Sequence, residues 1–557
     1  MGKYEKLYDL GGHHYPVTTK SKKAQKWFNR GLLWTYGYNH EEAVNCFNKA
    51  IEADPDCAMA HWGLAYAAGP NYNMPWHLFD DKNRASALST GYHSSQTALK
   101  LTKGLTDWEA ALVKALPTRY PQIDPVDDMS PWNDDFADAM RAAFRDNSES
   151  LEVRTIFAES LLNRTPWKMW DLPSGKPADD ASTEEAQAVL EEAMDQQPAA
   201  MDHPGLLHLY VHLMEMSPFP EKALKAGDRL RTLVPDAGHL VHMPTHIDVL
   251  CGHYRDVVHW NEQASIADLK YWRKNGSFNI YSGYRLHNYH FVIYGALFVG
   301  QIAPALAAVR GAAETVPEEM LRLESPPMAN YFESYLAMLP HVLVRFGKWR
   351  EATELELPED QQLYCTMTAN VHYARGVAHA ALGNVDAAEA EEKLFLEAKT
   401  GVPKSRLLHN NKVIDLLDIA AEMLRGEILY RKGAYEEAFA ALRKSVELDD
   451  ALPYDEPWGW MQPTRHALGA LLLEQGQLEE AEDTFRADLG LGGKLSRASI
   501  HPDNVWSLKG LYDCLKARDE TVEIVQIEQR LELANARADK AVSASCFCAQ
   551  AALQAAE

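Results

Sequence analysis

Histidine residues gather in one part of this 557-residue chain, at spacings that suit the binding of a metal ion. Residues 203–290 hold 10 of the 22 histidines, and most of these lie in the stretches HPGLLHLYVHLMEMS (203–217) and AGHLVHMPTHID (237–248). Neutral imidazole is the commonest metal ligand in proteins, and two histidines four residues apart on a helix can bind the same ion. The candidate metal ligands are His208, His212, His242, His246 and His290.

A carboxylate stands one helical turn after the second of these histidines. Glu215 can bind the ion, orient an imidazole or carry a proton, and we take it as the candidate catalytic residue. An imidazole-rich set without thiolates suits a divalent transition metal such as Zn, Fe or Cu. Two alternatives stay open: a metal-free polar groove that binds a peptide or an anionic ligand, and histidines that only form structural hydrogen bonds. The candidate substrate-binding residues are His239, His287, Trp460, Arg465 and His466.

The elements that must position these residues are helices arranged in a repeat. Residues 27–55 match the tetratricopeptide pattern, a 34-residue helix–turn–helix unit, and related segments recur later in the chain. Gly31 and Ala43 are small enough for two helices to approach closely, and Phe47 fills the space between them. We therefore predict an all-α protein, a right-handed α-solenoid of degenerate tetratricopeptide repeats with inserted loops. It would form one continuous array over 1–557, with N-terminal repeats in 1–200, His-rich central repeats in 201–315 and C-terminal repeats in 316–557.

Counting within the repeat places the histidines in register. His208 and His212 fall at positions 5 and 9 of a first helix, and His242 and His246 follow them after 34 residues each. Positions 2, 5 and 9 share one face of a helix. Because first helices of successive repeats line the concave wall of such a solenoid, we expect seven histidines in one groove. The other three are His239, His287 and His290, and His466 takes position 5 of a later repeat.

Charge and composition limit the partners of the chain. Lys and Arg total 55 against 79 for Asp and Glu, a formal charge of -24, which disfavours nucleic acid and anionic membrane surfaces. Seven cysteines form no disulfide framework, and the sequence has no signal peptide and no membrane-spanning run, so we expect a cytoplasmic protein. Cys546 and Cys548, in the motif SCFCA, are a weak second candidate for metal binding.

The stretches FNRGLLWTYGYNHEEA (28–43), 203–217, 237–248 and HNYHF (287–291) carry a resemblance. The chain resembles a widespread group of bacterial and fungal tetratricopeptide-repeat proteins over nearly its whole length and, more distantly, the tetratricopeptide repeat protein 38 group. The resemblance implies that the chain is one integrated unit, rather than a solenoid joined to a separate enzyme, and it does not indicate which reaction, if any, the protein catalyses. Tetratricopeptide folds are also known as scaffolds that bind peptides through positions 2, 5, 9 and 12 of the first helix. Those scaffolds typically place Lys, Arg and Asn there, whereas this chain has His and Glu.

Two functions follow from these observations. The first is a metal-dependent enzyme acting on a small molecule in the concave groove, with the histidines binding the ion and Glu215 carrying the proton. Zn would suit a hydrolase or lyase, and Fe or Cu would suit an oxidoreductase. The alternative is a non-catalytic tetratricopeptide scaffold that binds a peptide or a partner protein. A metal-storage or metal-sensing protein is a third class.

Overall fold

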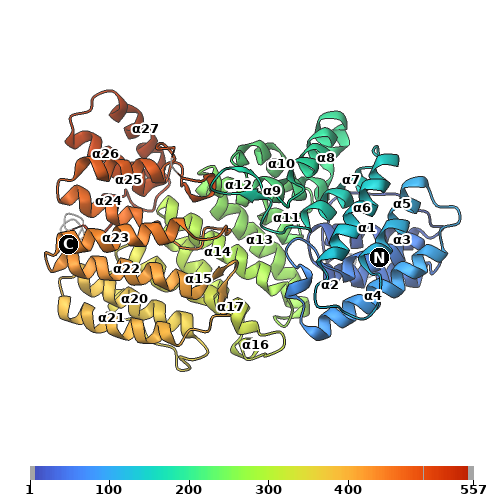
Figure 1. Ribbon diagram of the computed structural model, residues 1–557, viewed down its shortest axis with the longest axis horizontal. Coiled ribbons are helices and arrows are strands. Elements are labelled where there is room, and N and C mark those ends of the chain that lie inside the picture. Colours follow the sequence, from blue (N-terminus) through green and yellow to red (C-terminus); the bar gives the residue numbers. More distant parts are fainter. Residues whose placement is uncertain (1–6, 494, 550–557) are drawn as a thin grey trace. The chain divides into compact units, whose positions relative to one another are not determined.

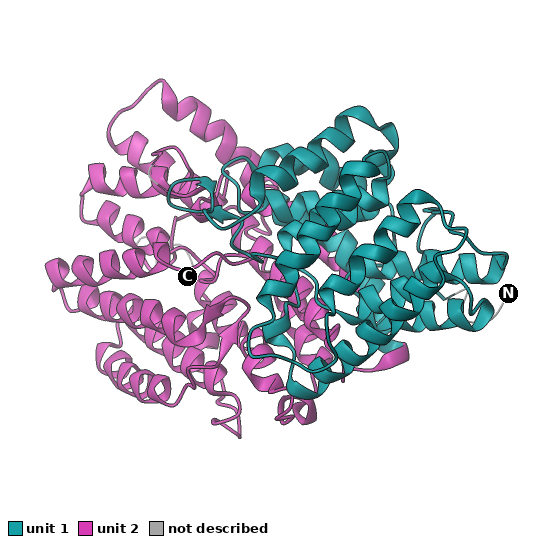
Figure 2. Cartoon of the chain, turned by 45° about the vertical axis from the view of Figure 1, so that its right-hand side comes forward, with its two compact units in different colours: residues 1–247, 266–273 teal, residues 248–265, 274–557 magenta. Residues whose placement is uncertain are grey.

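A computed structural model describes residues 7–493 and 495–549 of the chain. The chain folds into two compact units (Figure 2). Unit 1 consists of residues 1–247 and 266–273, and unit 2 of residues 248–265 and 274–557. Two helices contribute residues to both units, α12 (Pro244–Leu250) and α13 (Tyr254–Asn275). The prediction of one continuous array over 1–557, with its three regions, stays a prediction.

Unit 1 is built of consecutive helices in chain order (Figure 1). They are α1 (Lys22–Tyr36), α2 (His40–Ala53), α3 (Ala58–Ala68), α4 (Asp81–Lys100), α5 (Asp107–Ala115), α6 (Ser130–Asp146), α7 (Leu151–Leu162), α8 (Thr183–Gln196), α9 (Pro204–Met214), α10 (Leu224–Leu230) and α11 (Gly238–His242). Neighbours in sequence pack on each other, α1 against α2 and α2 against α3.

Unit 2 follows the same plan. Its helices are α14 (Ser282–Val299), α15 (Ile302–Thr315), α16 (Glu318–Leu321), α17 (Met328–Leu336), α18 (Leu339–Arg345), α19 (Trp349–Thr353), α20 (Cys365–Ala381), α21 (Val385–Thr400), α22 (Val413–Arg431), α23 (Tyr435–Asp450), α24 (Arg465–Glu474), α25 (Leu478–Asp488), α26 (Val505–Ala517) and α27 (Glu523–Asn535). Figure 1 shows α20, α21, α22 and α23 side by side, as their mutual packing requires.

Short elements occupy the connections. The strands pair as two antiparallel hairpins, β1 (Trp170–Asp171) with β2 (Lys176–Pro177) and β3 (Leu407–Leu408) with β4 (Asn411–Lys412). The 3-10 turns are η1 (Trp76–Leu78), η2 (Leu116–Arg119), η3 (Pro198–Asp202), η4 (Pro220–Ala223) and η5 (Arg497–Ser499). The hairpins are only two residues long on each side, so the prediction of an all-α fold is confirmed.

The small and large residues of the repeat meet in the core of each unit. In unit 1, an added Cβ at Gly31 of α1 would lie 2.7 Å from the ring of Phe47, and one at Gly63 of α3 would lie 2.3 Å from it. In unit 2, a Cβ at Gly469 of α24 would lie 2.5 Å from the ring of Phe485. Any side chain at these glycines would overlap the ring, so the glycines set how closely the helices approach.

Among the described residues, the helices are too short or too polar for any of them to cross a lipid bilayer.

Candidate metal centre

Helix α9 carries the first two candidate ligands, and its sequence explains where it begins. His203 is the N-cap residue, and its Nδ1 accepts a hydrogen bond of 3.1 Å from the backbone N–H of Leu206. Pro204 follows at the first helical position, where a missing N–H costs nothing. All residues of α9 are buried, which agrees with its nearly continuous apolar sequence. The helix therefore holds His208 and His212 inside the protein.

The ring of His208 is oriented by the end of α1. Gly205 lets α9 approach that end, because a Cβ there would lie 2.5 Å from the ring of Tyr36. The Nδ1 of His208 then lies 2.7 Å from the carbonyl oxygen of Tyr36. A carbonyl only accepts, so Nδ1 carries the proton and Nε2 carries the lone pair. This Nε2 is buried and has no hydrogen-bond partner among the residues that the structure describes.

Glu215 orients two further imidazoles. Its Oε1 lies 2.9 Å from Nδ1 of His212, and its Oε2 lies 2.6 Å from Nδ1 of His246. The carboxylate is fully buried. Because a carboxylate accepts from both rings, both Nδ1 atoms are protonated, and in a neutral ring the Nε2 atom then carries the lone pair. This geometry supports the orienting role of Glu215, and its role as a proton carrier stays a prediction.

The second histidine stretch is divided by Pro244, which ends α11 and begins α12 because proline has no N–H to continue the helix. His239 and His242 belong to α11, and His246 belongs to α12. The Nε2 atoms of His242 and His246 are 2.7 Å apart, so the Nε2–H of His242 donates to the lone pair of His246. The two rings are thus in contact although they belong to different helices.

Three imidazoles of unit 1 converge on one point. One nitrogen from each of His208, His212 and His239 lies within 4.8 Å of the other two. Their side chains are 1%, 0% and 1% exposed, so they lie in the interior and line no open groove. Burial, with the neighbouring histidines, lowers the pKa of His208 and His239 well below its ordinary value. These rings are therefore neutral, the state that a metal ligand requires.

Two tyrosines cover the converging imidazoles. The ring of Tyr38 stacks on His212 and His239, with centroids 5.8 and 5.5 Å apart, and Tyr72 lies 4.5 Å from His212. Tyr38 has a φ of 53°, a left-handed conformation that is costly for an aromatic residue. Such strain is held in place by the surrounding packing and is often found at functional sites.

A second group of histidines in unit 1 is built differently. His13 and His203 direct their Nε2 atoms at Glu152, at 3.4 and 3.3 Å. Burial alone would raise the pKa of Glu152, but His203 and His13 bring it below its ordinary value. Since Nδ1 of His203 accepts from the backbone of α9, its Nε2 must carry the proton and has no lone pair for a metal. This group caps a helix and is a poor metal site.

Two of the predicted histidines, His287 and His290, lie on α14 of unit 2. The Nε2 of His290 lies 2.9 Å from the sulfur of Met461, and burial lowers its pKa to about 3. The ring of His287 stacks on His409 with centroids 5.2 Å apart. The structure thus brings together His208, His212, His239, His242 and His246 in unit 1, and it describes His287 and His290 separately in unit 2.

The other predicted substrate-binding residues of unit 2 have protein partners. Trp460 packs against the rings of His341 and Tyr373, with centroids 5.0 and 5.7 Å away. Arg465 forms two bonds of 2.5 Å with Asp450. His466 accepts from Arg345 at Nδ1, at 2.8 Å, and donates from Nε2 to Asp488, at 2.9 Å. Their role in substrate binding stays a prediction.

Sequence reasoning missed Tyr36, Tyr38 and Tyr72, although each contacts the histidines of unit 1. Tyr36 acts through its backbone carbonyl, 172 residues before His208, and no side-chain pattern could reveal that. Tyr38 follows Gly37 in the turn between α1 and α2. An aromatic residue in such a turn is the only signal, and it is weak.

Comparison with known proteins identifies the repeats. A family model described as Tetratricopeptide repeat matches residues 39–68 and 406–455, and the first match overlaps the repeat predicted at 27–55. The chain therefore contains tetratricopeptide repeats in both units. No curated protein matches the sequence.

Solved structures of other helical proteins align with most of the chain. The Cut9–Hcn1 hetero-tetramer of the APC/C gives 11% identity and a TM-score of 0.30, covering 93% of this chain and 78% of the other. Yeast Tom70 gives 13% identity and a TM-score of 0.28, covering 93% and 96%. Naa15/Naa10 bound to HypK-THB gives 11% identity and a TM-score of 0.20, covering 92% and 70%. These scores are too low to support an argument.

Proposed function

We propose that this chain is a tetratricopeptide scaffold with a transition-metal centre inside unit 1, held by His208, His212 and His239. The proposal is carried by the direction of the ring protons. His208 and His212 donate Nδ1–H outward, to a carbonyl and a carboxylate, which turns their Nε2 lone pairs inward. Metal-binding histidines almost always have such a partner on the second nitrogen, which fixes the tautomer and the ring.

The ligand set defines the class of metal. Three imidazoles without a thiolate suit Zn, Fe, Cu or Ni. When bound, such an ion acts as a Lewis acid and also joins the helices that supply its ligands. The protein's own groups do the rest: the Tyr36 carbonyl and Glu215 orient the rings, and Tyr38 and Tyr72 keep water away from them.

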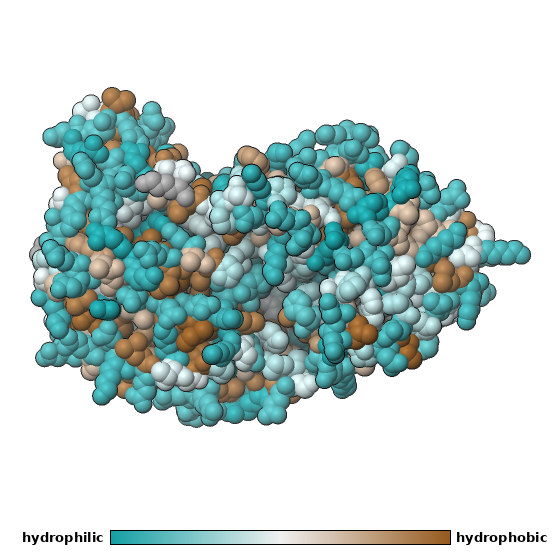
Figure 3. Space-filling view, in the orientation of Figure 1, coloured by the Kyte–Doolittle hydropathy of each residue, from teal (hydrophilic) through white to brown (hydrophobic). Residues whose placement is uncertain are grey.

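The scaffold part of the proposal is supported by the repeats. Positions 5 and 9 of the His-bearing helices are buried, so a peptide must bind elsewhere on the chain. On the face drawn in Figure 3, the described residues show hydrophobic side chains scattered among hydrophilic ones. The formal charge of -24 then favours a partner segment with basic residues. The narrower resemblance to the tetratricopeptide repeat protein 38 group stays a prediction.

A second candidate function is a metal-dependent enzyme acting on a small molecule, with Glu215 as proton carrier. One observation favours it: three protein ligands leave a fourth position on a tetrahedral ion for water or substrate. Two observations favour the scaffold instead. The imidazoles are buried, and both oxygens of Glu215 already accept from histidine rings.

Metal analysis of the full-length protein tests the proposal. Protein purified without chelator should contain stoichiometric Zn, Cu, Fe or Ni, and His239→Ala should lose it while keeping its helix content. The matched control is His466→Ala, which removes a buried histidine of unit 2 and should leave the metal in place. A wild-type protein that contains no such metal and gains none on dialysis against each ion would overturn the metal centre.

A further inference from the structure

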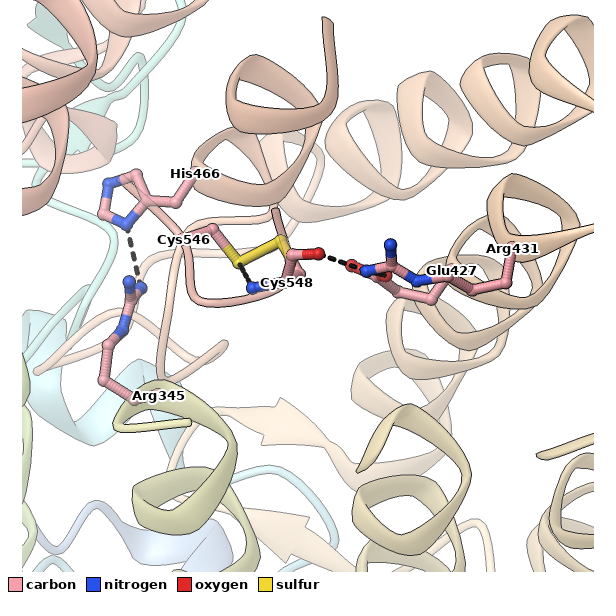
Figure 4. The surroundings of a disulfide bond; sticks show 6 residues. All are labelled: Arg345, Glu427, Arg431, His466, Cys546 and Cys548. Carbon is pink, nitrogen blue, oxygen red and sulfur yellow. Dashed lines mark hydrogen bonds and ion pairs between the residues drawn. A yellow bond between two sulfur atoms is a disulfide. The ribbon is translucent and has the colours of Figure 1, made fainter. Parts of the chain in front are cut away.

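Cys546 and Cys548 of unit 2 are joined by a disulfide, close to the end of the described chain (Figure 4). Cys548 is 1% exposed, whereas Cys546 is half-buried. Other thiols of the chain are poorly suited to reaction, because burial raises the pKa of Cys57 and Cys365 to about 11 and that of Cys514 to about 12. These three thiols are therefore less suited to thiol chemistry than the Cys546–Cys548 pair.

The segment that carries the pair is seated on unit 2 by defined contacts. The ring of Phe547 meets Trp506 edge to face, with centroids 5.7 Å apart. Gly347 makes room for it, since a Cβ there would lie 2.8 Å from the Cβ of Phe547. Arg431 donates a hydrogen bond to the carbonyl oxygen of Cys548. None of these contacts is made by a sulfur atom, so breaking the disulfide removes none of them directly.

The surroundings of the sulfurs favour a thiolate. The backbone N–H of Cys548 donates to Sγ of Cys546 at 3.2 Å, and such a bond stabilises negative charge on that sulfur. Figure 4 shows the guanidinium of Arg431 directed at the carbonyl oxygen of Cys548, and Glu427 lies 3.9 Å from this guanidinium. Glu427 is fully buried and offsets part of the positive charge. A positive group and an N–H donor are the features that lower thiol pKa values in reactive cysteines.

The position of the bond also argues against a purely structural role. A disulfide stabilises a fold mainly by closing a loop, and its gain grows with the length of that loop. These cysteines are separated by only two positions in sequence, so the closed loop is very short and the gain is small. A bond that contributes little to stability, with one of its two cysteines only half-buried, is suited to being broken and reformed.

We propose that Cys546 and Cys548 form a redox-active pair that exchanges two electrons with small thiols and their disulfides. In reduction, a thiolate attacks Sγ of Cys546, the bond between the two sulfurs breaks, and the electron pair leaves on Sγ of Cys548, which takes up a proton. A second thiolate attacks the external sulfur of the mixed disulfide and releases Cys546 as a thiolate. The pair gains two electrons, and the two small thiols become one disulfide.

Glutathione is the probe for the experiment. The full-length protein is equilibrated with reduced and oxidised glutathione at a series of ratios, alkylated, and digested with trypsin. Residues 541–557 contain both cysteines and no Lys or Arg, so the pair is released in one peptide for mass spectrometry. We expect this peptide to pass from disulfide to doubly alkylated dithiol across the series. A pair that stays in one state at every ratio would overturn the proposal.

Single variants test which sulfur is attacked. With oxidised glutathione, Cys548→Ser should form the mixed disulfide at Cys546 roughly tenfold faster than Cys546→Ser forms it at Cys548, because Cys546 is accessible and its sulfur receives an N–H. Cys514→Ser removes a buried thiol and is the matched control, whose titration should equal the wild type. Equal rates in the two single variants would contradict the assignment of Cys546.

Discussion

His208 in unit 1 and His466 in unit 2 take the same position in the first helix of a repeat and are both buried, but their ring nitrogens have different partners. His208 donates Nδ1–H to a carbonyl, so its Nε2 lone pair faces other imidazoles. His466 accepts at Nδ1 from Arg345 and donates Nε2–H to Asp488. Only the first ring has a lone pair to offer a metal. Partners, more than residue type or position, decide what a buried histidine can do.

Glu215 of unit 1 and Asp488 of unit 2 also differ in their hydrogen-bond partners. Glu215 binds Nδ1 of His212 and of His246, which leaves both Nε2 atoms pointing away from it. Asp488 binds Nε2 of His466 and Nδ1 of His501, whose remaining nitrogen bonds to Tyr294. Asp488 also accepts from the side chains of Asn504 and Ser507. Asp488 therefore links two imidazoles, an amide and a hydroxyl, whereas Glu215 orients two imidazoles, of which His212 belongs to the proposed metal centre.

The pKa values follow from these networks. Burial lowers the pKa of His466 to about 4, against the pull of Asp488, and the bond from Arg345 requires the neutral ring. Burial would raise the pKa of Asp488, but the several donors around it hold the value well below its usual range. Unit 2 thus contains an ionised carboxylate and a neutral imidazole, both fixed by hydrogen bonds.

Removal of the unit 2 carboxylate should have the largest effect on stability. Asp488→Ala leaves two imidazoles, an amide and a hydroxyl buried without their shared acceptor. We expect the free energy of unfolding to fall by about 3–5 kcal/mol, measured by urea denaturation of the full chain. A fall below about 1 kcal/mol would mean that this network does not hold unit 2 together.

Loss of a metal ligand in unit 1 comes next. Zinc at a hundredfold excess over its dissociation constant should stabilise the wild-type protein by about 2.7 kcal/mol. His212→Ala should show no such gain in a thermal unfolding experiment, because one of three converging rings is missing. His466→Ala should show the full gain despite a lower starting stability. If zinc stabilised His212→Ala as much as the wild type, His212 would not be a metal ligand, and the proposed contrast between the histidines of unit 1 and His466 of unit 2 would be wrong.

Glu215→Gln should have an intermediate effect. The amide of glutamine has one acceptor oxygen, so it can orient only one of the rings of His212 and His246, and its NH2 group opposes the Nδ1–H of the other. We expect metal to be retained with a 10–100-fold weaker affinity, or about 1.4–2.7 kcal/mol, in a zinc competition titration. Complete loss of metal would identify Glu215 as a ligand, and an unchanged affinity would remove its orienting role.

Acidification should give the smallest effect that can be measured. The unfolded chain takes up a proton on His466 near pH 6.5, whereas the folded chain, with a pKa of about 4, does not. Stability from this group is therefore lost as the pH falls. Between about pH 7 and pH 5, the wild type should lose about 2 kcal/mol relative to His466→Gln, measured by urea denaturation. A difference that stays constant with pH, or that grows in favour of the wild type on acidification, would refute the neutral state of His466.

The same comparison in unit 1 sharpens the metal assignment. His208 also has a lowered pKa, so the metal-free wild type should lose stability relative to His208→Gln in the same direction. With zinc present, the wild type should lose more stability on acidification than it does without metal, because protons then compete with the ion for the imidazoles. Zinc should not enlarge the difference in stability between the wild type and His466→Gln, because both proteins keep the proposed ligands in unit 1.

Much of the fold was predictable from the sequence, because repeat spacing and small-to-large packing are local properties. The pattern of Gly31 and Phe47 predicted a helix pair, and the structure adds that Gly63 contacts the same ring. The division into two units was not predicted. It depends on which surfaces of the repeats bury one another, and neither residue type nor period encodes that.

The site was predictable in composition but not in arrangement. The 34-residue separations pointed to His208, His212, His242 and His246, yet His239 is the ring that meets His208 and His212. Pro244 separates His242 on α11 from His246 on α12, so the register of an unbroken helix does not continue across it. The burial of the rings was also missed, because Tyr38 and Tyr72 come from distant segments.

The most direct test of the account is X-ray absorption at the metal edge of the zinc-loaded, full-length protein. We predict a first shell of nitrogen and oxygen at about 2.0–2.1 Å with the signature of about three imidazoles, and no sulfur. The His208→Ala, His212→Ala, His239→Ala triple variant should lose this signal, and the His466→Ala control should keep it. A sulfur shell at about 2.3 Å, or an imidazole signal that survives in the triple variant, would contradict a histidine centre in unit 1.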